Sequence, residues 1–258
     1  ESRLIEEIMD ENVLCARTLD DQEKVAAMIE KYGLVAIPII DHENCLVGIV
    51  TVDDAMTVLQ DEATEDISIM AGVTPNEDSY FGTSVFQHAK NRALWLMLLM
   101  LSATVSGEIL AHYESAMAVM PILITFIPML MGTSGNCGSQ SSTMVIRGIA
   151  VGEIEFKEFF KVVFKEIRIA ILVGLMLAVV NGIRVYIMYD QDIMLAIAIG
   201  ITMIAIVCMA KCIGCTLPLF AKKIGLDPAL MAAPLISTIM DTCTILMYFA
   251  IITAFFKL

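Results

Sequence analysis

Five long apolar segments constrain this chain more than any other feature of its sequence, in which 58% of residues are hydrophobic. They lie at about residues 93–113, 116–133, 163–189, 193–220 and 229–256. Each can reach the ~20 residues that an α-helix needs to cross the hydrocarbon core of a membrane, although the second does so only with the polar residues after Met131. The sequence therefore predicts a multi-span α-helical membrane protein with five transmembrane helices per chain.

Charge divides the chain into two parts. Residues 1–80 carry 19 acidic and 4 basic side chains, whereas residues 81–258 carry 10 acidic and 12 basic ones. Crowded carboxylates repel nucleic acid and attract multivalent cations. We therefore expect an acidic cytoplasmic domain at 1–66, a connecting linker or helix at 67–91 and a transmembrane pore domain at 92–258, and no nucleic-acid partner.

The acidic domain has the pattern of a small α/β unit. Strands are expected at about 13–16, 35–40 and 45–51, and helices at about 20–32 and 55–60. Thr51 and Asp54 stand where a strand enters a helix, and a hydroxyl and a carboxylate at this spacing can hold a ribose or phosphate at a helix N-terminus. The same spacing is also typical of an ordinary helix cap, so both interpretations stay open.

A run of carboxylates follows this strand. Its members are Asp53, Asp54, Asp61, Glu62, Glu65 and Asp66. Glu62 and Glu65 are neighbours on one face of a helix, and like charges at that spacing are destabilising without a counter-ion. Hard oxygen ligands suit Mg²⁺ or Ca²⁺, so the run predicts a divalent-cation site.

Asp241 is the only charged residue between Pro228 and Phe256, and it lies near the middle of the fifth apolar segment. A carboxylate at that depth costs about 3 kcal/mol on insertion scales, so residues of this kind are rare and usually functional. Neutral oxygens are available to the same site from Ser134, Asn136, Gln140 and Thr238. Mg²⁺ keeps several of its waters and is bound through one or two carboxylates, so one Asp per chain suits a hydrated ion on a two-fold axis between two copies.

Basic residues predict the orientation in the membrane. Ten of those in residues 81–258, Lys211 among them, fall on one side and only Arg184 and Lys257 on the other. This excess predicts a cell-membrane protein whose N-terminus is cytoplasmic and whose C-terminus is extracellular. No phosphate-binding loop, zinc-protease or nucleophile-elbow motif occurs in the chain, so we expect no enzyme activity.

Several stretches resemble the MgtE-type magnesium channels and transporters. They are Phe126–Gln140 (Phe-Ile-Pro-Met-Leu-Met-Gly-Thr-Ser-Gly-Asn-Cys-Gly-Ser-Gln), Arg147–Ile154, Gly225–Ala229, the segment around Asp241, and Lys31–Pro38 and Val47–Asp54 with Glu62–Asp66. The last three are similar to the second motif of a cystathionine-β-synthase (CBS) domain and the linker after it. The similarity runs from about Ile5 to Phe256.

This resemblance implies a homodimer whose pore is lined by the second and fifth spans of each chain. The aspartate matching Asp241 is the ion site of the family's pore. Acidic residues matching Asp54, Glu62, Glu65 and Asp66 bind Mg²⁺ in the family and close the pore when internal Mg²⁺ is high. Family members can also bind ATP at their CBS domains.

The chain departs from the family pattern in several places. Residues 1–258 hold no match to the family's N-terminal helical domain or first CBS motif, Thr57 stands where the family often has another acid, and Thr-Cys-Thr follows Asp241. We expect a passive Mg²⁺ channel or transporter that is gated by its acidic domain. Two alternatives stay open: the same fold carrying Mn²⁺, Co²⁺ or Ca²⁺, and a non-conducting membrane receptor that senses nucleotide.

Overall fold

The chain divides into two units. The computed structural model describes Leu4, Glu7, Met9 and residues 12–76, 78–189 and 192–257. Most of residues 1–11, where the predicted acidic domain begins, therefore lie outside the described residues. Unit 1 comprises Glu1–Ile67 and unit 2 comprises Ser68–Leu258. The expected strands and helices can be compared with each unit in turn.

Unit 1 is a three-stranded sheet with two helices. Its elements are β1 (Ala16–Arg17), α1 (Gln22–Tyr32), β2 (Ala36–Ile40), β3 (Leu46–Thr51) and α2 (Val52–Met70). β2 is central and pairs in parallel with β1 and antiparallel with β3. The Asp21 carboxylate caps α1 by accepting from the Glu23 amide, and Gly33 ends the helix with a φ of 61°. Ile29 and Ile37 are fully buried in the small core beneath them.

Helix α2 is longer than predicted. The sequence pattern predicts a helix that ends near Gln60, whereas α2 continues to Met70. Neither Gly nor Pro occurs between Val52 and Met70, and the first breaker is Gly72, which has a φ of +69°. The acidic run therefore lies on one helix, as the helix-face spacing of Glu62 and Glu65 implies.

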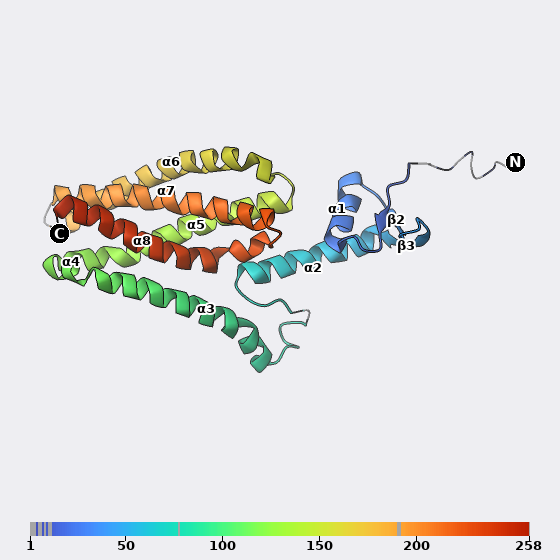
Figure 1. Cartoon of the computed structure of the whole chain (residues 1–258), viewed down its shortest axis with the longest axis horizontal. Helices are drawn as coiled ribbons and strands as arrows, with labels where there is room; N and C mark the ends of the chain where they lie inside the picture. Colours follow the sequence, from blue (N-terminus) through green and yellow to red (C-terminus); the bar gives the residue numbers. More distant parts are fainter. Residues whose placement is uncertain are drawn as a thin grey trace. The chain divides into compact units, whose positions relative to one another are not determined.

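Unit 2 is helical throughout its regular structure (Figure 1). Its elements are α3 (Val85–His112), α4 (Glu114–Val119), the 3-10 helix η2 (Pro121–Phe126), α5 (Ile127–Ala150), η3 (Phe156–Glu158), α6 (Phe159–Met188), α7 (Ile193–Lys223), η4 (Pro228–Met231) and α8 (Ala233–Phe256). By length and composition alone, three helices in the described part of the chain could cross a membrane: α3, α7 and the segment Pro228–Phe256. The count of five spans stays a prediction.

The second predicted span has the wrong bounds. Residues 116–133 do not form one helix, because α4 ends at Val119 and η2 and α5 follow. Pro121 begins η2, and Pro128 lies in the first turn of α5, which is where proline is tolerated in a helix. The small polar residues 134–143 thus lie in the middle of the regular helix α5.

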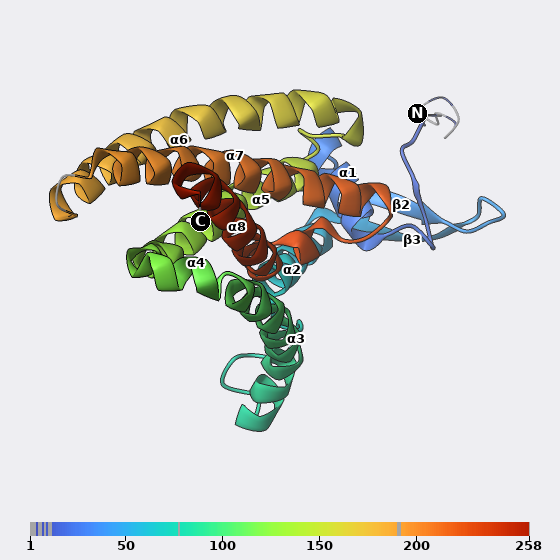
Figure 2. The same ribbon diagram turned by 60° about the vertical axis from the view of Figure 1, so that its left-hand side comes forward.

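Helix α7 is the centre of unit 2, since it packs against α5, α6 and α8 (Figure 2). The core is apolar and includes Phe126, Met240 and Tyr248, and the Tyr248 hydroxyl donates to the Leu123 carbonyl at 2.9 Å. Helix α3 packs mainly on α8 and leaves most of its leucine and methionine side chains exposed. An apolar outer surface of this kind suits contact with lipid.

Candidate ion pathway

Helix α5 has two faces that differ in burial. Its buried face includes Ser134, Gly138, Ser141, Val145 and Ile149, spaced at three and four residues. The opposite face is exposed and forms a polar stripe, which consists of Gly132, Asn136, Gln140, Thr143 and Arg147. The same helical spacing separates its members, so all five residues lie on one side of the helix and the four that have side chains point in one direction. The predicted pore residues Asn136 and Gln140 both belong to this polar stripe.

Helix α8 lies antiparallel to α5 and very close to it. Ser142 Oγ donates to the Met231 carbonyl at 2.5 Å near one end of the contact, and Thr244 Oγ1 donates to Ser134 Oγ at 2.6 Å near the other. Between them, a Cβ at Gly138 would come within 2.7 Å of Ile236. Small residues are needed here because they let helix backbones approach.

Asp241 lies on α8 between these contacts and is partly exposed. The next residue, Thr242, shares a hydrogen bond of 2.7 Å with Ser106 of α3. Helix α8 is therefore fixed by hydroxyl pairs on two sides, to α3 through Thr242 and to α5 through Thr244. No described residue forms a hydrogen bond or ion pair with the Asp241 carboxylate.

Two of the predicted pore residues are enclosed within a single chain. Ser134 is fully buried and Thr238 is 8% exposed. Ser134 Oγ donates to the Met131 carbonyl, and Thr238 Oγ1 donates to the Pro234 carbonyl. Within one chain, Ser134 lies in the contact between α5 and α8, and Thr238 bonds to its own helix. Their place at the pore stays a prediction.

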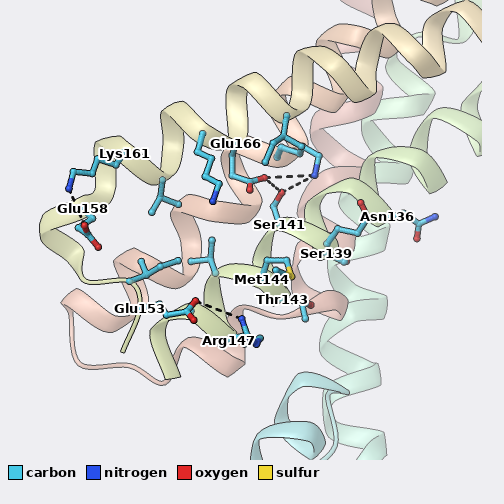
Figure 3. A pocket seen from close by; sticks show the side chains of 18 residues that line it. Asn136, Ser139, Ser141, Thr143, Met144, Arg147, Glu153, Glu158, Lys161 and Glu166 are labelled. Carbon is cyan, nitrogen blue, oxygen red and sulfur yellow. Dashed lines mark hydrogen bonds and ion pairs between the residues drawn. The ribbon is translucent and has the colours of Figure 1, made fainter. Parts of the chain in front are cut away.

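A second charged group inside unit 2 was not anticipated from the sequence. Lys211 of α7 and Glu166 of α6 lie 3.8 Å apart, and their side chains are only 6% and 12% exposed. Ser141 of α5 joins them, because its hydroxyl accepts from Lys211 at 3.2 Å and donates to Glu166 at 2.5 Å (Figure 3). A single lysine within a long apolar segment was the available signal, but the orientation count treated it as a flanking residue.

This ion pair borders a cavity of about 970 Å³ between α5, α6 and α7 (Figure 3). Asn136 and Gln140 of the polar stripe line the same cavity. The charges of Lys211 and Glu166 neutralise each other there, whereas Asp241, near the middle of α8, has no ion-pair partner among the described residues.

The acidic residues predicted to bind Mg²⁺ fall into two groups along α2. Asp54 stands eight residues before Glu62, about 12 Å along the helix axis. Mg²⁺ binds oxygen at about 2.1 Å, so one ion cannot join Asp54 to Glu62, Glu65 or Asp66 of the same chain. Glu62 accepts from Gln22 Nε2 at 2.9 Å, and Glu65 is exposed.

Thr51 and Asp54 bind each other. The Thr51 hydroxyl donates to Asp54 Oδ2 at 2.6 Å and the Thr51 amide does so at 3.1 Å. These two hydrogen bonds, the hydroxyl first, lower the pKa of Asp54 below its ordinary value. The geometry is that of a helix cap, so the nucleotide interpretation stays a prediction. Among the described residues, no three His, Cys, Asp or Glu side chains gather as a metal-binding cluster.

Comparison with known proteins agrees with the division into two units. Residues 127–251 match the MgtE family, described as divalent cation transporter, and residues 5–61 match the CBS domain family. The chain therefore contains a CBS domain and an MgtE-family domain. The MgtE-family domain contains α5 to α7 and most of α8, and so both Asp241 and the buried ion pair.

Three curated relatives match nearly the whole chain. The proteins named magnesium transporter MgtE from Thermus thermophilus, Bacillus subtilis and Enterococcus faecalis are 35%, 36% and 33% identical over 96%, 97% and 98% of the chain. The chain spans about half the length of these relatives, 54% to 55%. Together with the long apolar helices, the MgtE-family domain makes this a multi-pass membrane protein.

Proposed function

We propose that this chain forms a channel or transporter through which Mg²⁺ crosses the cell membrane passively. Two findings support the proposal: relatives named magnesium transporter match nearly the whole chain, and the family of residues 127–251 is described as divalent cation transporter. An inward-negative potential supplies about 2.3 kcal/mol per charge per 100 mV, so roughly twice that for Mg²⁺.

Asp241 carries the proposal. Glu166, whose side chain is nearly buried, has its own lysine, whereas no described residue forms an ion pair with the partly exposed Asp241. A second copy of the chain would bring a second Asp241, and a hydrated divalent ion between the two would offset the cost of both charges. We therefore infer a homodimer in which the polar stripe of α5, with Asn136 and Gln140, lies beside the ion.

The acidic face of α2 is the proposed sensor. Glu65 and Asp66 lie three and four residues after Glu62, so both are neighbours of Glu62 on one helix face. A bound Mg²⁺ would relieve the repulsion between these carboxylates. Because Asp54 is too far along α2 to share that ion, it would need a partner from elsewhere, such as the second copy. Mg²⁺ binding would favour the closed state and act as a ligand-biased two-state switch.

The orientation of the chain is also proposed. Lys211 is removed from the count of flanking basic residues because it is buried and paired. Nine basic residues then face two, which still favours a cytoplasmic N-terminus and an extracellular C-terminus.

Flux of Mg²⁺ into liposomes tests the pore. Asp241→Asn removes the charge and keeps the shape, and it should reduce flux at least tenfold. Asp192→Asn is the matched control, because Asp192 caps α7 by accepting from the Leu195 amide at 3.0 Å and Asn caps a helix equally well. Equal flux in wild type and Asp241→Asn would refute the pore assignment. Competition with Mn²⁺, Co²⁺ or Ca²⁺ in the same assay identifies the preferred ion.

Protease protection tests the sensor. Mg²⁺ should protect residues 61–90 from cleavage, and Glu62→Gln with Glu65→Gln should remove that protection. Cleavage that does not change up to about 10 mM Mg²⁺, the weak end of protein sites, would contradict gating by α2 while leaving the pore assignment intact.

A further inference from the structure

The cavity between α5, α6 and α7 has a mostly apolar wall. Met144 and Val145 of α5, Ile154 of the connecting loop, and Val162 and Ile169 of α6 contribute to it. A volume of about 970 Å³ is at the upper end of the range of ligand-binding cavities. This part of the wall is therefore suited to hydrocarbon, whereas Asn136 and Gln140 line another part of the same cavity.

Basic side chains stand around this apolar wall. Arg147, Lys161 and Lys165 all line the cavity. Arg147 is 3.8 Å from Glu153 and Lys161 is 3.1 Å from Glu158, and all four side chains are at least 38% exposed. Exposed ion pairs of this kind contribute little to the free energy of folding. Among the described residues, no carboxylate pairs with Lys165, so the rim carries one uncompensated positive charge.

The position of Lys161 also indicates an anion. Lys161 lies in the first turn of α6, where the helix macrodipole is positive and a lysine is disfavoured. The acid at this helix end is the N-cap residue Glu158, which pairs with Lys161, and no acidic residue lies within the first turn itself. An anionic group at this end of α6 would offset both the dipole and the lysine charges.

The neighbouring surface of α6 is built for lipid. Phe160 and Phe164 are 82% and 63% exposed, and Leu172 further along the helix is 65% exposed. Helix α6 lies at the outer edge of unit 2 in both views (Figures 1 and 2). Phe160 and Phe164 lie on the side of α6 away from Val162 and do not line the cavity. They indicate that this end of α6, which carries the basic rim, is surrounded by lipid.

We propose that this cavity binds an anionic phospholipid, with its phosphate at Lys165 and Lys161 and part of an acyl chain against Val162 and Ile169. Basic clefts between membrane helices are a known way to hold such headgroups. The buried pair of Glu166 and Lys211 forms a neutral end of the cavity and takes no part in charge recognition. This site goes beyond ion transport and does not depend on it.

Native mass spectrometry of the delipidated full chain in detergent tests the site. Phosphatidylglycerol should bind more tightly than phosphatidylcholine. Lys165→Gln should weaken phosphatidylglycerol binding about fivefold, which corresponds to the ~1 kcal/mol expected per basic residue. Lys222→Gln is the matched control, since Lys222 is an exposed lysine near the end of α7 and does not line the cavity; it should bind as wild type does.

Val162→Trp is a second variant that fills the cavity without changing its charge, and it should also weaken phosphatidylglycerol binding. Equal affinity for the two lipids, or wild-type affinity in both Lys165→Gln and Val162→Trp, would overturn the proposal. Displacement of phosphatidylglycerol by an equal concentration of inorganic phosphate would show a free-anion site instead of a lipid site, and would overturn it as well.

Discussion

Removing one charge of the pair between Lys211 and Glu166 should destabilise unit 2 strongly. The two groups are 3.8 Å apart and nearly buried, which gives an attraction of about 4 kcal/mol at an effective dielectric constant of about 20. Lys211→Met leaves Glu166 as an uncompensated buried carboxylate, and such changes lower the free energy of unfolding by about 3–5 kcal/mol. Glu166→Gln leaves the lysine in the same condition and should cost a similar amount.

The double variant separates charge pairing from packing. Glu166→Gln combined with Lys211→Met removes both charges, and the glutamine oxygen can still accept from the Ser141 hydroxyl. Replacing a complete buried ion pair by neutral groups is often nearly neutral, so the double variant should lie within about 2 kcal/mol of wild type.

The measurement is the free energy of unfolding from titration with a denaturing detergent in mixed micelles. Lys222→Met, at an exposed lysine near the end of α7, is the control and should stay within about 0.5 kcal/mol of wild type. Single variants that each cost less than about 1 kcal/mol, with additive effects in the double variant, would refute the reasoning.

Three further predictions follow from other contacts. Gly214→Ala should prevent close packing of α5 on α7, because the added Cβ would collide with the Gly138 carbonyl; the yield of folded protein in detergent should fall sharply, and a wild-type yield would contradict the contact. Thr244→Val removes the hydroxyl that donates to α5 at 2.6 Å and leaves a buried acceptor, so it should cost about 1–3 kcal/mol of unfolding free energy; a cost below 0.5 kcal/mol would argue against that bond. The pKa of Asp54, measured by NMR, should lie below the ordinary value of about 3.9 for an aspartate, because the carboxylate accepts hydrogen bonds from Thr51. Because the pKa of Asp54 is lower in the folded state than in the unfolded state, the ionised carboxylate stabilises the fold above about pH 4, and this stabilisation is lost as the pH falls through the folded-state pKa. Thr51→Val should return the pKa of Asp54 to its ordinary value. An unchanged pKa in this variant would exclude the hydrogen bond from the Thr51 hydroxyl as the cause of the shift.

The sequence predicted local structure where local chemistry decides it. Asp21 and Gly33 are ordinary cap residues, and α1 ends where they indicate. The sequence did not predict that α2 continues to Met70. The polar and acidic residues after Gln60 obscure the helical repeat of apolar residues, but they do not break a helix. Pro121 and Pro128 were the signal that residues 116–133 are not a single helix.

Pairing between helices was harder to predict than the helices themselves. Lys211 and Glu166 are 45 residues apart, and only the packing of α6 on α7 brings them together. The enclosed position of Ser134 likewise depends on Thr244, which belongs to another helix. With a single sequence, nothing links such pairs until the fold is known.

The glycine contact between α5 and α7 has a mechanical consequence. Because backbone meets backbone at Gly138 and Gly214, no side chain can change rotamer to absorb a displacement, and we expect these two helices to travel as one rigid body. Relative motion must then occur at α8, whose hydroxyl pairs with Ser106 and Ser134 can break and re-form as the helix slides. Spin labels should report a constant distance between α5 and α7 as Mg²⁺ is added, and a changing distance between α5 and α8. The reverse pattern would show that α5 and α7 move relative to each other and that α8 does not move relative to α5.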